Sequence, residues 1–534
     1  CNVPFLILAV SDIFYFPFTL KRTTSDLTGM TVDLVDQLMS YLKGFWFVVP
    51  ALLLLIASVE VMYRRGPQLK NIPGNIASQI ALLLVTAGLW VLAARGGFQV
   101  KPLSPINAAA YASTQLSPAV TNTPFTFLFS LTKSKLPQRD YFTEQKAATL
   151  FNVNKNFSTN PSASLSTKPL NVVIIVLESF SREYLERFGN LHNLTPFLDS
   201  LYEIGYGCDN AFANGKHSNE GIPAVFASLP TLMDESFISS AYQQNEFNGI
   251  ASLLKPLGYQ TAFFHGAHNG TFNFDKFAQR AGFDRYYGKD EYPDQSDYDG
   301  QWGIWDAPYL QFVSNTLTQT KEPFCAGVFT LSSHYPFRLP TPYYAQFKNI
   351  GTHPLHPCIR YTDLALQKFF ETASQQSWYN NTLFVVTSDH TSQADDPSYN
   401  TPLGTYRVPL VFYAPGYDSK GNLSRASMQV DVMPSVLEKL GYTGPFVSFG
   451  QSVFDSTAHS FAYQFRSGVY QACDDSVFVL FDGTNALAYY NYREDPLLKK
   501  PISTKPPEEL INRLKAVVQQ YNAAMNKNKL SVER

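Results

Sequence analysis

Charged residues and cysteines are scarce in this chain. Asp, Glu, Lys and Arg make up only 16% of its 534 residues, and the formal net charge is −2. Nucleic-acid binding draws most of its affinity from an excess of positive charge, so we expect no nucleic-acid partner. The five cysteines include no CxxC pair, and their spacing defines no disulfide pattern. Disulfides and buried free thiols both remain open at this point.

Aromatic residues are abundant instead, with 42 Phe and 31 Tyr. The chain is also longer than one hydrophobic core usually supports, so we expect a membrane part joined to a globular part. The first residue is Cys1, in the middle of an apolar run, from which we expect a further N-terminal part before it.

Residues 1–96 are predicted to be a membrane region with transmembrane helices near 45–63 and 76–94. The second of these runs contains no charged residue and is long enough to cross a bilayer. The positive-inside rule assigns the loop between them to the cytoplasm, because it carries Arg64, Arg65 and Lys70. We therefore expect a multi-pass membrane protein whose remaining chain is extracytoplasmic, that is, periplasmic or external.

Residues 97–168 are rich in Ser, Thr, Asn, Pro and Ala and are predicted to be a linker. Within residues 169–534, strand-like runs alternate with helix-like segments, which favours a largely parallel sheet with helices on both faces. The predicted strands are 171–177, 259–264, 325–331, 383–388 and 409–413. The predicted helices are 195–204, 246–256, 306–319, 361–375 and 430–440. After them we expect antiparallel strands at 477–481 and 486–492 and a terminal amphipathic helix at 506–526.

Acidic side chains end two of the predicted strands. Glu178 follows the first strand, Asp389 and His390 follow the fourth, and Ser218 lies between two glycines in the intervening sequence. Because the carboxyl ends of parallel strands meet at one edge of a sheet, we expect these four side chains to meet there. They form a nitrogen and oxygen ligand set for a divalent cation, beside which a serine becomes an activated nucleophile. Taken alone, Glu178 could equally be a surface acid and Ser218 a helix N-cap.

Other polar side chains flank this candidate site. His265 and His268 also follow a predicted strand and could bind a second ion or the substrate. Lys216 and His217 precede Ser218 and could offset the charge of a phosphate group. The alternative for Lys216 and His217 is a solvated loop residue without a functional role.

Six short motifs follow one another in a characteristic order. They are Val-Leu-Glu178-Ser-Phe, Asn214-Gly-Lys-His-Ser218-Asn-Glu-Gly, Leu331-Ser-Ser-His334-Tyr-Pro-Phe, Thr387-Ser-Asp389-His390, Tyr406-Arg-Val-Pro-Leu and Gln429-Val-Asp-Val-Met-Pro434. With them the chain resembles the alkaline-phosphatase superfamily, and within it the lipoteichoic acid synthase-like branch of sulfatase-fold membrane enzymes. The resemblance covers roughly residues 170–450 and the preceding membrane helices. It implies an α/β domain with a central, mostly parallel sheet flanked by helices and a small C-terminal antiparallel sheet, anchored in a bacterial cell membrane.

The resemblance also implies a metal centre. In that family a Glu, an Asp, a His and a Thr nucleophile hold a manganese-type ion. Glu178, Asp389 and His390 match these ligands, and Ser218 takes the place of the Thr as ligand and nucleophile. We expect one divalent cation, Mn²⁺ first, with Mg²⁺ or Zn²⁺ as alternatives. Aligning on Gly-Lys would instead place His217 at the nucleophile position; we favour Ser218, because a phosphohistidine would be unusual there.

Three further positions bear on the substrate through the same resemblance. His334 is implied to contact the substrate phosphate or to donate a proton to the leaving group. Phe272 stands where lipoteichoic acid synthases carry a Trp, and Phe274 where they carry an Arg that contacts glycerol phosphate. The missing Arg weakens the expectation of a phosphatidylglycerol donor. Trp302 and Trp305 could line the pocket instead.

These features lead to one function hypothesis with alternatives. We expect a metal-dependent transferase that moves a phosphoglycerol-type group from a phosphatidylglycerol-like membrane lipid to an envelope polymer or glycan, through a covalent Ser218 intermediate. The alternatives are a phosphoethanolamine transferase, a phosphodiester or sulfate ester hydrolase on the same site, or a non-catalytic envelope protein stabilised by a metal. A formylglycine sulfatase is disfavoured, because the sequence after Ser218 lacks the Pro and Arg of a Cys/Ser-x-Pro-x-Arg motif.

Overall fold

The computed structural model divides the chain into two compact units, residues 1–133 and 134–534. It describes every residue except 1–2, 20–21, 24–42, 67–74, 99–116, 132–135, 158–164, 167, 190–191, 241, 243–244, 419, 504–506 and 533–534.

The first unit is helical. Its described helices are α1 (Val3–Thr19), α3 (Val48–Arg65), α4 (Ile76–Arg95), α5 (Ser117–Val120) and α6 (Thr123–Leu131). In the described part of the chain, α4 is the single helix that is long and apolar enough to cross a membrane, as predicted for 76–94. It begins at the Asn75 side chain, which accepts a hydrogen bond from the Ser78 amide, and ends at Gly96 in the left-handed conformation.

The span predicted at 45–63 receives less support. The helix there, α3, starts only at Val48 and carries Glu60, Arg64 and Arg65 toward its end, where Arg64 Nε lies 2.7 Å from a Glu60 oxygen. These charges lower its apolar character, so a second membrane crossing and a multi-pass topology stay predictions.

The second unit is built on an eight-stranded sheet in the order β10-β3-β9-β8-β2-β7-β5-β6. The strands are β2 (Asn171–Leu177), β3 (Tyr206–Cys208), β5 (Gln260–His265), β6 (Arg285–Tyr287), β7 (Phe324–Phe329), β8 (Thr382–Ser388), β9 (Leu410–Tyr413) and β10 (Gly421–Leu423). Within this sheet, β9 runs against its two neighbours and every other pairing is parallel. The predicted central, mostly parallel sheet is confirmed.

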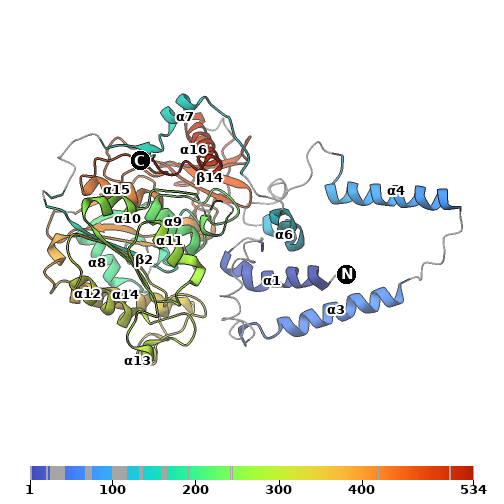
Figure 1. Cartoon of the computed structure of the whole chain (residues 1–534). Helices are drawn as coiled ribbons and strands as arrows, with labels where there is room; N and C mark the ends of the chain where they lie inside the picture. Colours follow the sequence, from blue (N-terminus) through green and yellow to red (C-terminus); the bar gives the residue numbers. More distant parts are fainter. Residues whose placement is uncertain are drawn as a thin grey trace. The chain divides into compact units, whose positions relative to one another are not determined.

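Helices cover both faces of this sheet (Figure 1). On one face, α8 (Pro196–Ile204), α12 (Asp306–Thr318) and α14 (Leu355–Ala373) pack on alternate side chains of β2, namely Val173, Ile175 and Leu177. On the other face lie α9 (Ser218–Ala227), α10 (Ile250–Leu254) and α15 (Val432–Lys439). Every residue of β2 is buried, because a strand covered on both sides has no solvent face. The remaining described helices of this unit are α7 (Glu144–Leu150), α11 (Phe274–Arg280), α13 (Thr341–Phe347) and α16 (Glu508–Lys527).

Three predicted boundaries differ from the structure for local reasons. The helix predicted at 246–256 is shortened to α10, which starts only after the N-cap Gly249 and ends at Leu254, because Pro256 cannot extend an α-helix. The helix predicted at 361–375 starts six residues earlier, at Leu355, since Pro357 falls in its first turn, where proline is tolerated. Strand β7 ends at Phe329 rather than 331, because Leu331 and Ser332 donate their amides to the Asp306 carboxylate.

The C-terminal part forms the predicted small antiparallel sheet. Its strands are β13 (Ala462–Arg466), β14 (Val469–Cys473), β15 (Val477–Phe481) and β16 (Ala486–Asn491). Short pairs complete the unit: β1 (Asn154–Lys155) with β12 (Phe446–Val447), and β4 (Ala211–Phe212) with β11 (Ser427–Met428). The four described cysteines, Cys208, Cys325, Cys358 and Cys473, are buried free thiols.

Part of the predicted linker belongs to this second unit. Within the predicted range 97–168, α7 packs beside α16. One side chain of α16, Gln519, is hydrogen-bonded to residues 141–142 just before α7. Its Oε1 accepts hydrogen bonds from the amides of Tyr141 (2.8 Å) and Phe142 (3.0 Å), and its Nε2 donates to the Phe142 carbonyl (2.8 Å). Composition alone did not reveal this, because the partner lies far away in the sequence.

Replacing Gln519 with Ala should therefore lower the free energy of unfolding of this unit by about 1–3 kcal/mol, because two backbone amides lose their acceptor. Urea denaturation measures the change, and Lys529→Ala, at an exposed position of the same region, serves as the control. Equal stability of the Gln519 variant and the control would contradict this account of the 141–142 contact.

Candidate metal-centred active site

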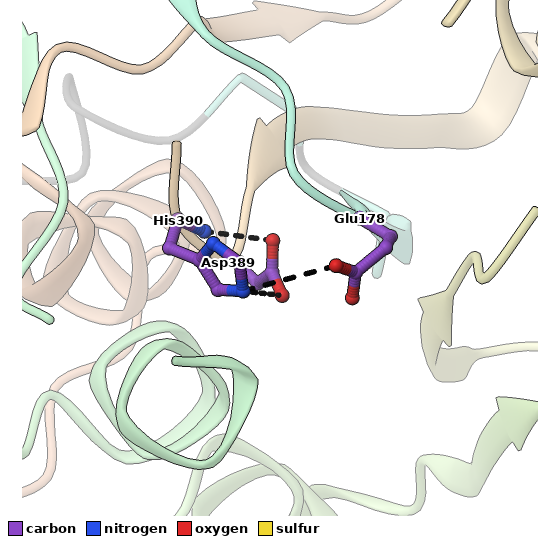
Figure 2. Close-up of side chains that lie close together, drawn as sticks. All are labelled: Glu178, Asp389 and His390. Atoms are coloured by element: carbon purple, nitrogen blue, oxygen red, sulfur yellow. Dashed lines mark hydrogen bonds and ion pairs between the residues drawn. The ribbon is translucent and has the colours of Figure 1, made fainter. Parts of the chain in front are cut away.

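The candidate site lies where β2 and β8 end. The two strands pair in parallel with Leu177 opposite Ser388, so the next residues, Glu178 and Asp389, leave the sheet side by side. Both carboxylates are buried. Figure 2 shows them converging with the imidazole of His390. In the described part of the chain this is the one group of acidic and His side chains with metal-ligand spacing, and one ligand atom from each lies within 4.8 Å of the others.

The Asp389 carboxylate is held on one side only. Its Oδ1 accepts hydrogen bonds from the backbone amides of Ser179 (2.8 Å) and His390 (2.7 Å). Its Oδ2 is buried and accepts no hydrogen bond from the described residues. A buried carboxylate oxygen without a donor is costly, so this atom is suited to a cation.

The His390 ring faces the same point with a lone pair. Its Nδ1 lies 2.9 Å from the Thr391 carbonyl, an acceptor, so the ring proton sits on Nδ1. Its Nε2 then presents a lone pair, 3.2 Å from Asp389 Oδ2 and 3.7 Å from Glu178 Oε1. Two carboxylates and one imidazole nitrogen thus face one another, and these are groups that bind a divalent cation. The residues therefore fit the predicted cation.

Ser218 brings the hydroxyl to this group. It is the first residue of α9, and its Oγ lies 3.2 Å from Glu178 Oε2 and 3.5 Å from His390 Nε2. The helix approaches closely because Gly221, one turn along, has no side chain: a Cβ there would lie 2.2 Å from the Asp389 carbonyl oxygen. The four side chains that were predicted to meet therefore lie together at this edge of the sheet.

The electrostatics of the group favour a bound cation. Burial raises the pKa of Glu178 well above its ordinary value, and the neighbouring charge of Asp389 raises it further. Burial also lowers the pKa of His390, against the opposing effect of Asp389. Two buried carboxylates repel each other, and a divalent cation would remove that repulsion.

Lys216 does not occupy the position predicted for it. Its ammonium group is buried and donates to Thr391 Oγ1 (2.6 Å), the Thr391 carbonyl (3.1 Å) and the Thr405 carbonyl (2.9 Å). Burial lowers its pKa to about 7. Since its donors are already engaged inside the protein, this geometry contradicts the expected contact between Lys216 and a substrate phosphate.

His217 forms the N-cap of α9, and its Nδ1 lies 3.1 Å from Glu220 Oε2. It is not part of the group with metal-ligand spacing. The alternative alignment with His217 as nucleophile therefore gains no support from the geometry, which brings Ser218 to the carboxylates.

His334 and His265 are neutral rings at the same edge. Burial lowers the pKa of each to about 4, and the charge of His390 contributes further at His334. His334 Nδ1 lies 2.9 Å from the Tyr335 carbonyl, and His265 Nδ1 lies 3.1 Å from the Phe329 carbonyl. His265 also stacks on Phe329. Its predicted role with a second ion gains no support, because it does not belong to the metal-spaced group.

An aromatic side chain lies against His334. The indole of Trp302 lies 4.1 Å from its ring, measured between centroids, and Phe272 stacks on that indole at 6.2 Å. His268 lies apart from this stack and contacts the Tyr298 hydroxyl at 3.2 Å through Nε2. Asp306, next to Trp305, has a structural role through its bonds to the loop after β7.

Sequence reasoning missed several supporting residues. Ser179 adopts a left-handed conformation (φ 62°), which directs its amide to Asp389 and its hydroxyl to Glu178 Oε1 at 2.6 Å. Thr391 and Thr405 hold Lys216. The Glu-Ser pair is visible in the sequence, but nothing in it indicates a positive φ or these distant contacts.

The similarity of the chain to known proteins shows its family. Residues 170–442, more than half of it, match the sulfatase family model, and the chain belongs to the sulfatase family. This confirms the expected superfamily and its α/β fold.

Among curated relatives the chain is homologous to lipoteichoic acid synthases. It is 26% identical to lipoteichoic acid synthase 1 of Bacillus subtilis over 359 residues, covering 62% of this chain and 55% of that protein. It is 24% identical to lipoteichoic acid synthase of Staphylococcus saprophyticus over 393 residues, covering 68% of this chain and 59% of that protein. The chain thus spans between half and three-fifths of the length of these two relatives.

Solved structures show the same fold. An alkaline phosphatase superfamily protein from Vibrio parahaemolyticus superposes with a TM-score of 0.65 at 23% identity, covering 74% of this chain and 99% of that one. The lipoteichoic acid synthase LtaP from Listeria monocytogenes superposes with a TM-score of 0.61 at 20% identity, covering 74% of this chain and 100% of that one.

Gly221 should be intolerant of a side chain. Gly221→Ala forces α9 away from the Asp389 carbonyl, which we expect to cost about 1–3 kcal/mol of stability and to displace Ser218. Thermal unfolding and metal titration measure the two effects. Gly88→Ala, where no atom lies within 4 Å of the added Cβ, is the control. A Gly221 variant that matches this control in both measurements would refute the close-approach argument.

Proposed function

We propose that this protein is a metal-dependent transferase that moves a phosphoglycerol-type group from a membrane lipid to an envelope polymer or glycan. The observation that supports it most directly is the Ser218 hydroxyl beside two carboxylates and an imidazole lone pair. A structural metal site is usually closed by protein ligands and needs no hydroxyl of this kind. The homology to lipoteichoic acid synthases favours phosphoglycerol as the transferred group.

In this proposal Glu178, Asp389, His390 and Ser218 hold one divalent cation, Mn²⁺ first, with Mg²⁺ or Zn²⁺ as alternatives. The bound cation supplies positive charge that favours the ionised form of the Ser218 hydroxyl. Ser218 Oγ attacks the phosphorus of the lipid phosphodiester, and diacylglycerol leaves as the bond to its oxygen breaks. The N-terminal end of α9 offers positive dipole charge to the transferred phosphate.

The second step returns the phosphoryl group to an acceptor. A hydroxyl of the polymer or glycan attacks the phosphoserine ester and releases Ser218. His334 can orient this hydroxyl, because its Nδ1 proton is donated to the Tyr335 carbonyl and its Nε2 is left as a hydrogen-bond acceptor. Water takes the proton of the hydroxyl, since the pKa of His334 is about 4. Its low pKa disfavours the proton-donor role expected from the sequence, so a water would protonate the departing diacylglycerol.

The location follows from the donor. A lipid donor requires the site to lie near headgroups, and α4 has the length and composition of a membrane anchor. We propose a bacterial cell-membrane protein with residues 1–96 as a multi-pass membrane region and residues 169–534 as an extracytoplasmic catalytic domain. The donor is then a phosphatidylglycerol-like lipid of the outer leaflet.

The surroundings of His334 favour one alternative donor. Trp302 contacts His334 and Phe272 stacks on Trp302, and an aromatic face can attract an ammonium group. A phosphoethanolamine transferase on the same site is therefore the second candidate. Incubation with labelled phosphatidylglycerol or phosphatidylethanolamine, followed by measurement of released diacylglycerol, separates the two. Release from neither lipid would count against both.

Ser218→Ala should abolish transfer, and the peptide containing residue 218 should no longer gain the mass of the transferred group. The reason is that no other described hydroxyl contacts both Glu178 and His390. Mass spectrometry after exposure to the lipids detects the adduct, and Ser200→Ala, at an exposed position of α8, is the matched control. Turnover by the Ser218 variant at the rate of the Ser200 variant would exclude the covalent route.

Metal binding should strengthen as the pH rises. Since the pKa of Glu178 is raised, a proton competes for this carboxylate at pH values where an ordinary Glu is already ionised. The apparent affinity for Mn²⁺ should fall as the pH is lowered through that pKa. Without metal, the sign for stability is opposite: the folded protein holds a proton that the unfolded chain has lost, so stability falls as the pH rises through the same pKa.

Isothermal titration calorimetry with Mn²⁺ between about pH 5 and pH 9 tests this prediction. Glu178→Gln should bind Mn²⁺ more weakly and with a flatter pH dependence, because that side chain no longer titrates. The same pH slope in both proteins would assign the dependence to another group.

A further inference from the structure

Two histidines of the site share an unusual pattern of contacts. His390 Nδ1 lies 2.9 Å from the carbonyl of the next residue, Thr391, and His334 Nδ1 lies 2.9 Å from the carbonyl of its next residue, Tyr335. In both rings this places the proton on Nδ1 and leaves Nε2 as a lone pair. The orientation of each ring therefore depends on one peptide carbonyl.

Each of these carbonyls is also held by a second donor from a distant segment. Lys216 Nζ lies 3.1 Å from the Thr391 carbonyl, and Trp302 Nε1 lies 2.6 Å from the Tyr335 carbonyl. A carbonyl oxygen has two lone pairs and can accept both bonds at once. The second donor fixes the peptide plane from outside, so the imidazole bound to it is fixed as well.

The Lys216 contact belongs to a larger group of hydrogen bonds. Its ammonium also reaches the Thr405 carbonyl at 2.9 Å, and Thr391 Oγ1 donates to that same carbonyl at 2.5 Å. The segment after β8 is thereby fastened to the 404–406 turn and to the loop that leads into α9. These hydrogen bonds are buried, so water does not compete with them. Lys216 lies two residues before Ser218, so the same side chain connects the nucleophile to the imidazole.

We propose that Lys216 is a positioning residue that sets the orientation and tautomer of His390 through the Thr391 carbonyl, and that Trp302 does the same for His334 through the Tyr335 carbonyl. The first half rests on the proposed role of His390 as a metal ligand. Neither Lys216 nor Trp302 has to touch substrate for this purpose. Lys216, two residues before the nucleophile, thus serves metal affinity, and Trp302 serves the geometry of the second step.

Lys216→Met tests the first half, because it keeps the length of the side chain and removes the donors. In the metal-free full-length protein labelled with ¹⁵N-histidine, the His390 signals should change from the pure Nδ1–H form to a mixture of tautomers. The Kd for Mn²⁺ should rise by about 10–100-fold, the range found when a supporting group of a metal ligand is removed. Lys276→Met, at an exposed lysine, is the matched control.

Trp302→Phe tests the second half. It keeps an aromatic ring beside His334 and removes only the Nε1 donor, so the His334 tautomer should change while the Kd for Mn²⁺ stays that of the unmodified protein. Lys216→Met should show the reverse pattern, with the His334 signals unchanged. This double dissociation separates positioning from a general loss of stability, which would alter both histidines in both variants.

The outcomes decide the inference separately from the proposed function. Unchanged His390 signals and an unchanged Kd in Lys216→Met would overturn the first half, and an unchanged His334 tautomer in Trp302→Phe would overturn the second. If Lys216→Met does not fold, Lys216→Gln retains neutral donors and should give a smaller change in the same direction. If the unmodified protein binds no divalent cation, the proposed metal function fails, while the tautomer measurements still decide the inference.

Discussion

The parallel pairing of β2 with β8 is the constraint on which the site depends. Its register sets Leu177 against Ser388, so two buried carboxylates emerge from the sheet next to each other. Such a pair is unfavourable unless something compensates it. The protein supplies amides to one oxygen of Asp389 and hydroxyl groups to Glu178, but leaves Asp389 Oδ2 without a donor. Burial and the neighbouring Asp389 charge raise the pKa of Glu178, and the incomplete compensation at Asp389 Oδ2 explains the fit to a divalent cation.

The placement of α9 turns a cation-binding edge into a candidate catalytic centre. Gly221 lets the helix contact the backbone of Asp389, and Gly215 lies so close to Glu220 that a Cβ would be 2.3 Å from that side chain. Both glycines are needed for close approach. They bring the first residue of the helix, Ser218, to the carboxylates with the positive end of the helix dipole beside it. A hydroxyl, a negatively charged ligand group and a helix N-terminus together suit transfer of a phosphoryl group, in keeping with the homology to lipoteichoic acid synthases.

Two supporting residues of the site, Lys216 and Trp302, make contacts that the sequence motifs do not indicate. Lys216 lies two residues before Ser218, and this position predicts a contact with phosphate. Its ammonium group instead lies inside the protein, where it donates to the carbonyls of Thr391 and Thr405. Trp302 is 32 residues from His334 and still contacts it. In both cases the side chain acts on a histidine through a peptide carbonyl. Such a contact cannot be predicted from the spacing of residues in the sequence, because it depends on where two loops meet in the folded protein.

The sequence alone predicted five strands of the central sheet, among them β2 and β8, which are each followed by an acidic residue. It also predicted that four residues meet at the ends of these two strands, since parallel strands share one edge. It did not predict β3, β6 and β10, which are only three residues long. It was insufficient for the linker, where residues 141–142 depend on Gln519, and for the orientation of Lys216. The difference is physical. Periodicity and strand ends are local properties that depend on neighbouring residues. The direction of a buried hydrogen-bond donor depends instead on acceptors that folding brings close from distant parts of the chain.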